Sequence, residues 1–171
     1  MKKTILVTGG TGFIGSHTTV ELQNAGYDVV IVDNLSNSQA DVVDGIEKIT
    51  GIRPAFEEVD CCDLAGLEAV FQKYPGIQGI IHFAASKAVG ESVEKPLMYY
   101  ENNLLSLINL LKLMPKYDVK GIIFSSSCTV YGQPDPENLP VTEEAPIKKA
   151  ESPYGNTKQI NEEIVQDYVK S

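Results

Sequence analysis

The sequence predicts an α/β protein built on a doubly wound parallel sheet, on three observations. Short, almost continuously apolar runs rich in β-branched residues recur along the chain. Segments with helical periodicity separate these runs. The first run leads directly into Val7–His17, in which four of eleven residues are glycine. Apolar strands that alternate with helices are typical of a parallel sheet covered on both faces.

The elements follow in a regular order. Thr4–Thr8 predicts the first strand, and an amphipathic segment from the glycines to about Ala25 predicts the first helix. Right-handed crossovers then produce the doubly wound fold, with the fifth strand as a possible bare edge. The remaining expected elements are strands Asp28–Asp33, Phe56–Val59, Gly79–Ala85 and Gly121–Ser127, and helices near Leu64–Tyr74, Leu97–Met114 and Tyr154–Lys170.

Size and composition exclude several classes of protein. The 171 residues suit one domain, residues 1–171, and a net charge of −9 without a basic cluster excludes nucleic-acid binding through phosphate contacts. The chain has no apolar stretch near the roughly 20 residues of a membrane span. We therefore expect a cytoplasmic protein that makes no contact with nucleic acid or membrane.

The cysteines and histidines argue against disulfides and against a metal site. Cys61, Cys62 and Cys128 are odd in number and two are adjacent, which makes a disulfide framework improbable and fits a reducing compartment. His17 and His82 do not complete a metal-ligand spacing with them. Neither histidine has a partner in the pattern, so we expect both to be structural.

One long segment, Gly132–Pro153, holds five of the nine prolines and shows little periodicity. Loops of this length in compact domains are usually functional or disordered. It follows the C-terminal end of a predicted strand, where ligands bind in open α/β sheets. We interpret it as a loop beside the active site; an interdomain linker is the alternative.

The glycines form a phosphate-binding pattern. Gly9, Gly12 and Gly15 are spaced G-x-x-G-x-x-G between a predicted strand and a predicted helix. The first permits a tight turn, the second leaves room for a pyrophosphate, and the third allows close packing of the helix. Free N–H groups and the dipole of the helix supply the anion site. Gly10 adds further freedom to the turn.

Asp33 completes this pattern as a dinucleotide site. It ends the second predicted strand, eighteen positions after Gly15. An acidic residue at this position accepts hydrogen bonds from ribose hydroxyls and repels a 2′-phosphate. The next five residues, 34–38, include no arginine or lysine. The sequence therefore predicts NAD as the cofactor in preference to NADP.

Tyr154 and Lys158 lie four residues apart and so share one face of the last predicted helix. Taken alone, such a pair is more often a surface pair than a functional one. However, an ammonium group and a positive nicotinamide ring together favour a tyrosine phenolate as general base. Ser127, at the end of the fifth predicted strand, suits a hydrogen bond to the reacting hydroxyl. These three residues are the candidate catalytic set.

Taken together, "TGGTGFIG", the serine and "YxxxK" resemble the extended short-chain dehydrogenase/reductase superfamily. The segments "HFAASKAVGESVEKPLMYYENN" (His82–Asn103) and "FSSSCTVYG" are most similar to the UDP-glucose 4-epimerases. The resemblance covers essentially the whole chain and departs only locally, at Ala85, Ser86 and Cys128. It implies a Rossmann-type, NAD-binding fold, truncated before the C-terminal portion that grips UDP and closes over the sugar.

The resemblance also implies a reaction, the interconversion of UDP-galactose and UDP-glucose through a 4-keto intermediate. Tyr154 would remove the 4-hydroxyl proton, Lys158 would hold the nicotinamide ribose and favour the phenolate, and Ser127 would assist at the sugar oxygen. NAD would take the C4 hydride and return it. The isolated chain is expected to be weakly active or inactive.

Further roles come from the same resemblance. Asp60 is similar to an adenine contact, and Asn102 to a neighbour of both cofactor and substrate. The helices Leu97–Met114 and Tyr154–Lys170 are similar to those that form a homodimer. The full set of candidate cofactor-binding residues is Gly9, Gly12, Phe13, Ile14, Gly15, Asp33, Asn34, Asp60, Phe83, Ala84, Lys87, Asn102, Tyr154 and Lys158.

Two alternatives remain open. One is another NAD-dependent nucleotide-sugar enzyme. Among these, a dehydratase is disfavoured, because an elimination needs a carboxylate at the positions that Cys128 and Thr129 occupy. An epimerase acting on N-acetylated or uronic sugars stays compatible with the sequence. The other alternative is a non-catalytic NAD-binding module, which has no need of Ser127, Tyr154 and Lys158 together.

Overall fold

The computed structural model describes residues 2–170. Its sheet has five strands, all parallel, in the order β3-β2-β1-β4-β5. The predicted doubly wound parallel sheet is confirmed; β1 and β2 have the predicted bounds, and the ends of the other three strands differ by up to three residues. The strands are β1 (Thr4–Thr8), β2 (Asp28–Asp33), β3 (Ala55–Glu58), β4 (Ile77–His82) and β5 (Gly121–Phe124).

The strand order reverses beside β1. From β1 the chain adds β2 and then β3 on one side, and it returns to add β4 and β5 on the other side. At such a reversal the loops after neighbouring strands diverge and leave a crevice at the carboxyl ends. Thr8, the last residue of β1, pairs with Val32 of β2 and with His82 of β4. This end of β1 is therefore where the fold allows a ligand to bind.

Burial explains the apolar runs. Leu6, Val7 and Ile31 in the two central strands are fully buried, so both faces of the sheet are covered there. β5 lies at one end of the strand order, as expected, and its Ile123 is 64% exposed. The two strands at the ends of the order, β3 and β5, have four residues each, whereas the inner strands have five or six. Short edge strands present few unpaired backbone groups.

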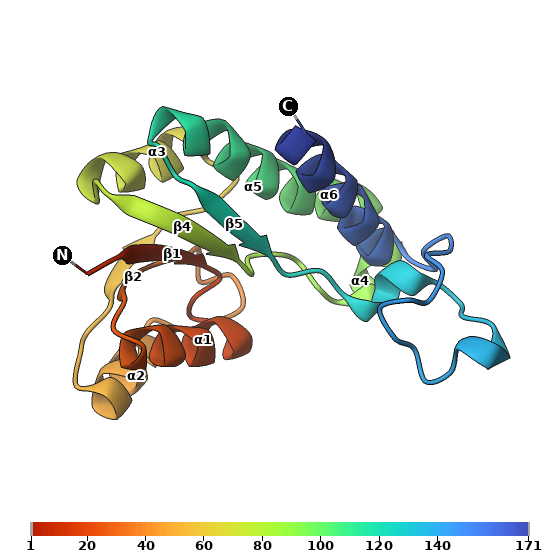
Figure 1. The fold of residues 1–171 in the computed structure, drawn as a ribbon, viewed down its shortest axis with the longest axis horizontal. Coiled ribbons are helices and arrows are strands. Elements are labelled where there is room, and N and C mark those ends of the chain that lie inside the picture. Colours follow the sequence, from red (N-terminus) through yellow and green to blue (C-terminus); the bar gives the residue numbers. More distant parts are fainter. Residues whose placement is uncertain (1, 171) are drawn as a thin grey trace. The chain divides into compact units, whose positions relative to one another are not determined.

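Helices cover the sheet on two sides. Figure 1 shows α1 (Phe13–Asn24) and α2 (Val42–Thr50) on one face and α3 (Leu64–Lys73) on the other. The core between β1, β2 and the α1–α2 face contains Val7, Val29, Ile31 and Ile46. Helix α2 was not expected from the sequence, because β-branched residues and Gly45 lower its helix propensity. Burial of Val43 and Ile46 against the sheet stabilises it instead.

The chain divides into two compact units. The first, residues 2–85 and Ser106–Ser125, contains the sheet with α1, α2 and α3. The second, Ser86–Leu105 and 126–170, contains α4 (Val89–Glu94), η1 (Cys128–Tyr131), η2 (Pro136–Asn138) and α6 (Pro153–Lys170). Helix α5 (Pro96–Lys116) begins in the second unit and ends in the first. The single domain expected from chain length stays a prediction.

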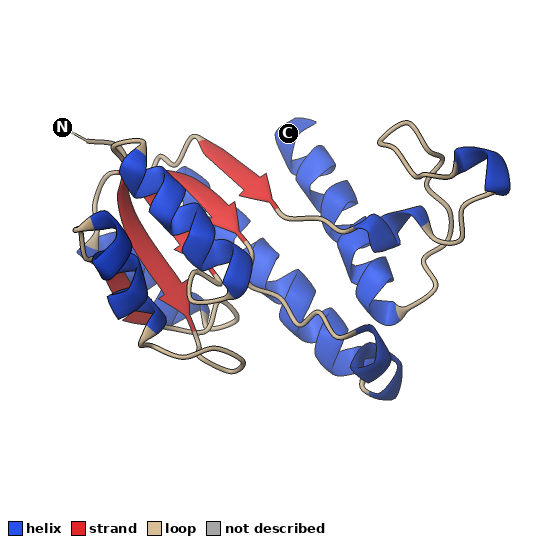
Figure 2. Cartoon of the chain, turned by 90° about the horizontal axis from the view of Figure 1, so that it is seen from below, coloured by secondary structure: helices blue, strands red, loops and turns tan. Residues whose placement is uncertain are grey.

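The proline-rich segment is a loop, as predicted. Figure 2 shows it as irregular chain between η1 and α6, interrupted only by η2. It is anchored within the second unit, because the Gln159 side-chain amide donates to the carbonyl oxygens of Val130 (2.7 Å) and Lys148 (2.5 Å). Lys148 also pairs with Asp135 at 2.6 Å. The loop is thus fastened to the helix that carries Tyr154 and Lys158.

Two further observations concern residues 2–170. Among their helices there is none whose length and apolar character would let it cross a bilayer. The same residues contain no cluster of three or more histidine, cysteine or acidic side chains suited to a metal ion.

Candidate functional site

The turn between β1 and α1 depends on glycine at its first position. Gly9 has φ +68°, and its N–H donates to the Val32 carbonyl at 2.8 Å. A Cβ at Gly9 would lie 2.7 Å from the Ala84 nitrogen. Any larger residue would therefore have to adopt a strained backbone and also displace the segment after β4.

The other two glycines of the pattern differ in what surrounds them. A Cβ at Gly15 would lie 2.2 Å from the Gly9 carbonyl oxygen, so α1 packs directly on the turn. A Cβ at Gly12 would meet only that same oxygen, at 3.2 Å. Gly12 is the N-cap of α1, and the first turn of a helix presents N–H groups without intrahelical partners. The open side of Gly12 is the room that a pyrophosphate needs.

Asp33 holds the glycine turn to the segment after β2. The residue is 7% exposed, and its carboxylate accepts from the Thr11 N–H (3.2 Å), the Leu35 N–H (3.0 Å) and the Ser38 hydroxyl (3.2 Å). The Thr11 and Ser38 hydroxyls are 2.7 Å apart. The predicted ribose-binding residue therefore lies beside the predicted phosphate-binding turn.

Asp60 and Asn34 come together at the ends of β3 and β2. The Asn34 side-chain amide donates to Asp60 Oδ2 at 3.0 Å, and the Cys62 N–H donates to Asp60 Oδ1 at 2.7 Å. Partial burial alone would raise the pKa of Asp60, but these hydrogen bonds outweigh it and lower the pKa below its ordinary value. An ionised Asp60 at neutral pH is an acceptor suited to an adenine amino group.

The end of β4 is joined to the glycine turn through Thr8. The Phe83 N–H donates to the Thr8 carbonyl at 3.0 Å, and the Ala84 N–H lies 3.4 Å from the Thr8 hydroxyl oxygen. His82 Nδ1 and the Thr8 hydroxyl are 2.6 Å apart, with His82 2% exposed. His82 was expected to be structural; the strand register places Thr8 opposite it and so gives it a buried hydrogen-bond partner.

Tyr154 and Lys158 share the first turns of α6, as their spacing predicts. The Lys158 ammonium lies 5.9 Å from the centre of the Tyr154 ring. Lys158 is 3% exposed, and burial lowers its pKa from 10.5 to about 8. At pH 7 the Lys158 side chain is still mostly protonated. Because it is buried, water shields its positive charge poorly, and the charge acts strongly on nearby groups.

Ser127 is oriented by the turn that follows it. Its hydroxyl oxygen accepts from the Thr129 N–H (3.3 Å) and the Thr129 hydroxyl (3.0 Å), and Ser127 is the N-cap of η1. The neighbouring Ser126 hydroxyl donates to the Glu162 carboxylate on α6. Gly155, beside Tyr154, lets Thr129 approach closely, because a Cβ there would lie 3.1 Å from the Thr129 carbonyl oxygen. Ser126 and Glu162, which sequence reasoning missed, thus fasten the serine segment to the tyrosine helix.

Lys87 and Asn102 also belong to the second unit. Lys87 is exposed in the segment between β4 and α4. The Asn102 side-chain amide donates to the Ser86 hydroxyl at 3.3 Å and to Asn103 Oδ1 at 3.0 Å. Of the remaining candidates, Phe13 and Ile14 are exposed on the first turn of α1, by 78% and 60%. The candidates therefore form one group in each unit.

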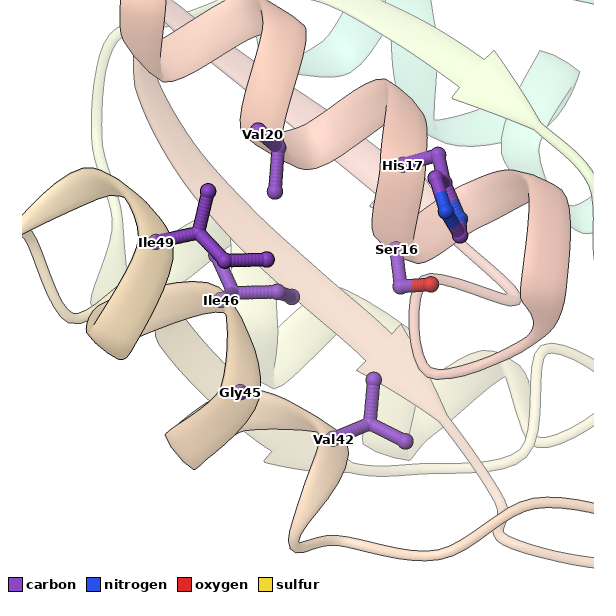
Figure 3. A pocket seen from close by; sticks show the side chains of 7 residues that line it. All are labelled: Ser16, His17, Val20, Val42, Gly45, Ile46 and Ile49. Atoms are coloured by element: carbon purple, nitrogen blue, oxygen red, sulfur yellow. The ribbon is translucent and has the colours of Figure 1, made fainter.

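A groove on the outer side of the first unit is separate from these residues. Figure 3 shows the side chains of α1 and α2 that line it. The volume of the groove is about 180 Å³. Its lining is mostly apolar and includes none of the predicted cofactor or catalytic residues. The groove is lined by Ser16, His17, Val20, Val42, Gly45, Ile46 and Ile49.

Comparison with known families decides the membership of the chain. The model of the NAD dependent epimerase/dehydratase family matches residues 5–171. The chain belongs to this family. The resemblance noted in the sequence is confirmed, and the family's name agrees with a dinucleotide site at the glycine turn.

Several epimerases are similar to this family member. UDP-glucose 4-epimerase of Schizosaccharomyces pombe is 51% identical over 169 residues, which are 98% of this chain and 47% of that protein. The Bacillus subtilis enzyme is 52% identical over 163 residues, 95% of this chain and 47% of that protein. The chain spans about half the length of the curated relatives it matches.

Solved structures agree with this assignment. UDP-glucose 4-epimerase from Bifidobacterium longum, in complex with NAD+ and UDP, has a TM-score of 0.92 and 51% identity. The match covers 96% of this chain and 48% of that one. The Stenotrophomonas maltophila enzyme, solved with NAD and a formylated UDP-arabinopyranose, has a TM-score of 0.90, 46% identity and coverages of 96% and 48%.

Replacement of Gly15 by alanine tests the packing of α1 on the turn. We expect Gly15→Ala to lower the free energy of unfolding by about 2 kcal/mol or more, because its Cβ would overlap the Gly9 carbonyl. Chemical denaturation measures the change. Gly45→Ala in α2 is the matched control, since its Cβ meets no atom within 4 Å, and should stabilise by about 0.5–1 kcal/mol. Equal effects of the two substitutions would contradict the packing argument.

The buried charge of Lys158 predicts a pH-dependent stability. A pKa lowered from 10.5 to about 8 corresponds to a destabilisation of about 3 kcal/mol below pH 8. The unfolded chain binds the proton more tightly, so this loss disappears as pH rises from 8 to 10.5. Lys158→Met should therefore be more stable than wild type at pH 7, and the gap should close toward pH 10.5 in urea titrations. A similar gap in exposed Lys112→Met would count against burial as the cause.

Proposed function

We propose that the chain binds NAD and supplies the cofactor-binding and catalytic residues of a nucleotide-sugar 4-epimerase. The observation that carries the proposal is the glycine turn with Asp33 beside it, which fits a dinucleotide. Membership of the family and the epimerases solved with NAD support it. The candidates at the adenine end are Asp33, Asn34 and Asp60; those at the nicotinamide end are Lys87, Asn102, Tyr154 and Lys158.

Preference for NAD over NADP follows from the surroundings of Asp33. Its carboxylate is buried at the end of β2, and the nearest residues after it, 34–38, carry no cation. A 2′-phosphate on the ribose would bring a second negative charge close to this carboxylate with no arginine or lysine from that segment to offset it. A ribose 2′-hydroxyl instead donates a hydrogen bond to it.

A titration of NAD against NADP tests this site. We expect the wild-type chain to bind NAD at least about tenfold more tightly than NADP. Asp33→Asn should reduce this ratio, because it removes the charge and keeps the shape. Asp44→Asn is the control, since Asp44 is an exposed partner of Arg53 on α2. Isothermal titration calorimetry gives both affinities, and equal wild-type affinity for the two nucleotides would contradict the assignment.

We propose for the whole protein the interconversion of UDP-galactose and UDP-glucose. Bound NAD would supply the acceptor, and then the donor, of the hydride at C4 of the sugar. Tyr154, as phenolate, takes the proton of the 4-hydroxyl and gives it back after the sugar has turned. The Ser127 hydroxyl, oriented by Thr129, donates a hydrogen bond to the sugar oxygen as it becomes a carbonyl.

Lys158 supports this chemistry through its charge. Because the ammonium is buried close to the Tyr154 ring, it stabilises the phenolate more than an exposed lysine would. The ring of Tyr99 packs edge-on against Tyr154, with centres 6.5 Å apart, and holds the phenol in one orientation. A base that is charged, oriented and partly shielded from water is what removal of an alcohol proton needs.

Two rival functions are less well supported. A dehydratase needs an additional acid or base near the strand-end serine, and the following residues are Cys128 and Thr129. Glu162, which does lie near, is engaged by the Ser126 hydroxyl. A binding-only module has no use for a buried lysine beside a tyrosine. An epimerase for N-acetylated or uronic sugars shares all of these residues and is the remaining alternative.

The reaction is tested with UDP-galactose carrying deuterium at C4. We expect the UDP-glucose formed by the holoprotein to retain the label at C4, because the same hydride leaves and returns. In a separate reaction of unlabelled UDP-galactose in heavy water, we expect no deuterium to enter the carbon skeleton. Tyr154→Phe should lower the rate by about 100-fold or more, which mass spectrometry of the product measures. Loss of label to solvent, or incorporation at C5, would indicate a different reaction.

We also propose a homodimer in a reducing, cytoplasmic compartment. The exposed apolar side chains of Leu97 (75%) and Leu105 (40%) on α5 and Val169 (76%) on α6 support an interface on these helices. Cys61, Cys62 and Cys128 are free thiols, which suits a reducing compartment.

A further inference from the structure

The segment that carries Lys87 is held by the side chain of a buried asparagine. Asn103 on α5 is 1% exposed, and its Oδ1 accepts from the Ser86 N–H at 2.8 Å. Its Nδ2 donates to the Ser86 carbonyl oxygen at 2.9 Å. The asparagine amide therefore pairs with both backbone groups of Ser86, as a neighbouring strand would.

A tyrosine one helical turn earlier holds the same segment on the other side of Lys87. Tyr99 is fully buried, and its hydroxyl accepts from the Ala88 N–H at 3.0 Å and donates to Glu91 at 2.9 Å. Tyr99 and Asn103 are four residues apart on α5 and so share one face of the helix. Lys87 thus lies between two residues whose backbones are anchored to that face.

The same face of α5 also contacts the helix that carries the catalytic candidates. Asn103 Nδ2 lies 3.1 Å from the Thr157 hydroxyl oxygen, next to Lys158 in sequence. The Thr157 hydroxyl donates to the Tyr154 carbonyl at 2.7 Å. Asn161 adds a bond from its amide to the Asn103 carbonyl at 2.9 Å. The ring contact between Tyr99 and Tyr154 completes the connection.

We propose that Tyr99 and Asn103 form a positioning clamp, which holds Lys87 at a set place relative to Tyr154 and Lys158. Neither clamp residue is assigned contact with cofactor or sugar; both act through the residues they hold. The inference rests on the proposed function in one respect, namely that Lys87, Tyr154 and Lys158 serve the nicotinamide end of NAD.

The physical reason is the way the Asn103 amide is used. A buried amide has one oxygen and two N–H donors, and here they engage Ser86 on one side and Thr157 on the other. Because the group is planar and removed from water, the two sides cannot move independently without breaking a buried hydrogen bond. An apolar residue at this position would pack but would not couple them.

The first test measures hydrogen exchange of single amides by ¹⁵N NMR in the 171-residue chain. Asn103→Ala should speed exchange of the Ser86 amide about tenfold or more, and Tyr99→Phe should do the same for the Ala88 amide. Leu110→Ala is the control, since Leu110 is a fully buried residue of the same helix and its loss lowers overall stability without touching the clamp. All variants are compared under conditions in which their free energies of unfolding are equal.

The second test separates positioning from simple stability by comparing NAD with ADP, which lacks both the nicotinamide and its ribose. We expect Asn103→Ala to weaken NAD binding about tenfold and ADP binding less than twofold. Thr157→Val, which removes only the α6 side of the clamp, should weaken NAD in the same way and leave the Ser86 amide protected. It also keeps the test decisive if Asn103→Ala fails to fold.

The results distinguish the clamp from the proposed function. Equal weakening of NAD and ADP binding, or exchange of the Ser86 and Ala88 amides no faster than in Leu110→Ala, would overturn the clamp. A wild-type chain that binds neither nucleotide would contradict the proposed function instead, and the exchange comparison would then decide the clamp alone.

Discussion

The close approach of the β1–α1 turn to its surroundings is the constraint on which the first unit depends. Gly9 touches the segment after β4, and Gly15 brings α1 against the carbonyl of Gly9. There is no space for a side chain at either point. Because of this contact, the helix begins directly above the end of the central strand, and its unpaired N–H groups open at the end of the sheet where Asp33 and Asp60 also lie. The geometry that the proposed dinucleotide site needs is thus a consequence of backbone packing.

Buried polar groups have a corresponding role in the second unit. Hydrogen bonds, and not only apolar contacts, hold its buried parts together. They are made by the side chains of Tyr99, Asn103, Thr157 and Asn161. Hydrogen bonds have fixed directions, so they specify the relative position of two segments more narrowly than apolar packing does. Lys158 is also buried, and desolvation lowers the pKa of its ammonium group to about 8.

Local patterns predicted most of the fold and the placement of several candidate residues. The strands, the parallel order and the helices α1, α3, α5 and α6 follow from apolar periodicity, and Gly12, Asp33, Tyr154 and Lys158 follow from spacing within one or two elements. Helices α2 and α4 were not predicted. α2 is rich in β-branched residues and lacks a side-chain cap, and α4 is only six residues long, so tertiary packing rather than propensity stabilises them.

What the sequence by itself determined is the type of sheet, the glycine turn with its acidic partner, and the pairing of Tyr154 with Lys158 on one helical face. All of these depend on residues close together in the chain. Only the tertiary structure decided that Thr8 meets His82, that Ser126 engages Glu162, and that Asn103 joins Ser86 to Thr157. Thr8 and His82 are 74 positions apart, and Ser126 and Glu162 are 36 apart. Asn103 is 17 positions from Ser86 and 54 from Thr157. No local period encodes them, because strand register and helix packing set which distant side chains meet.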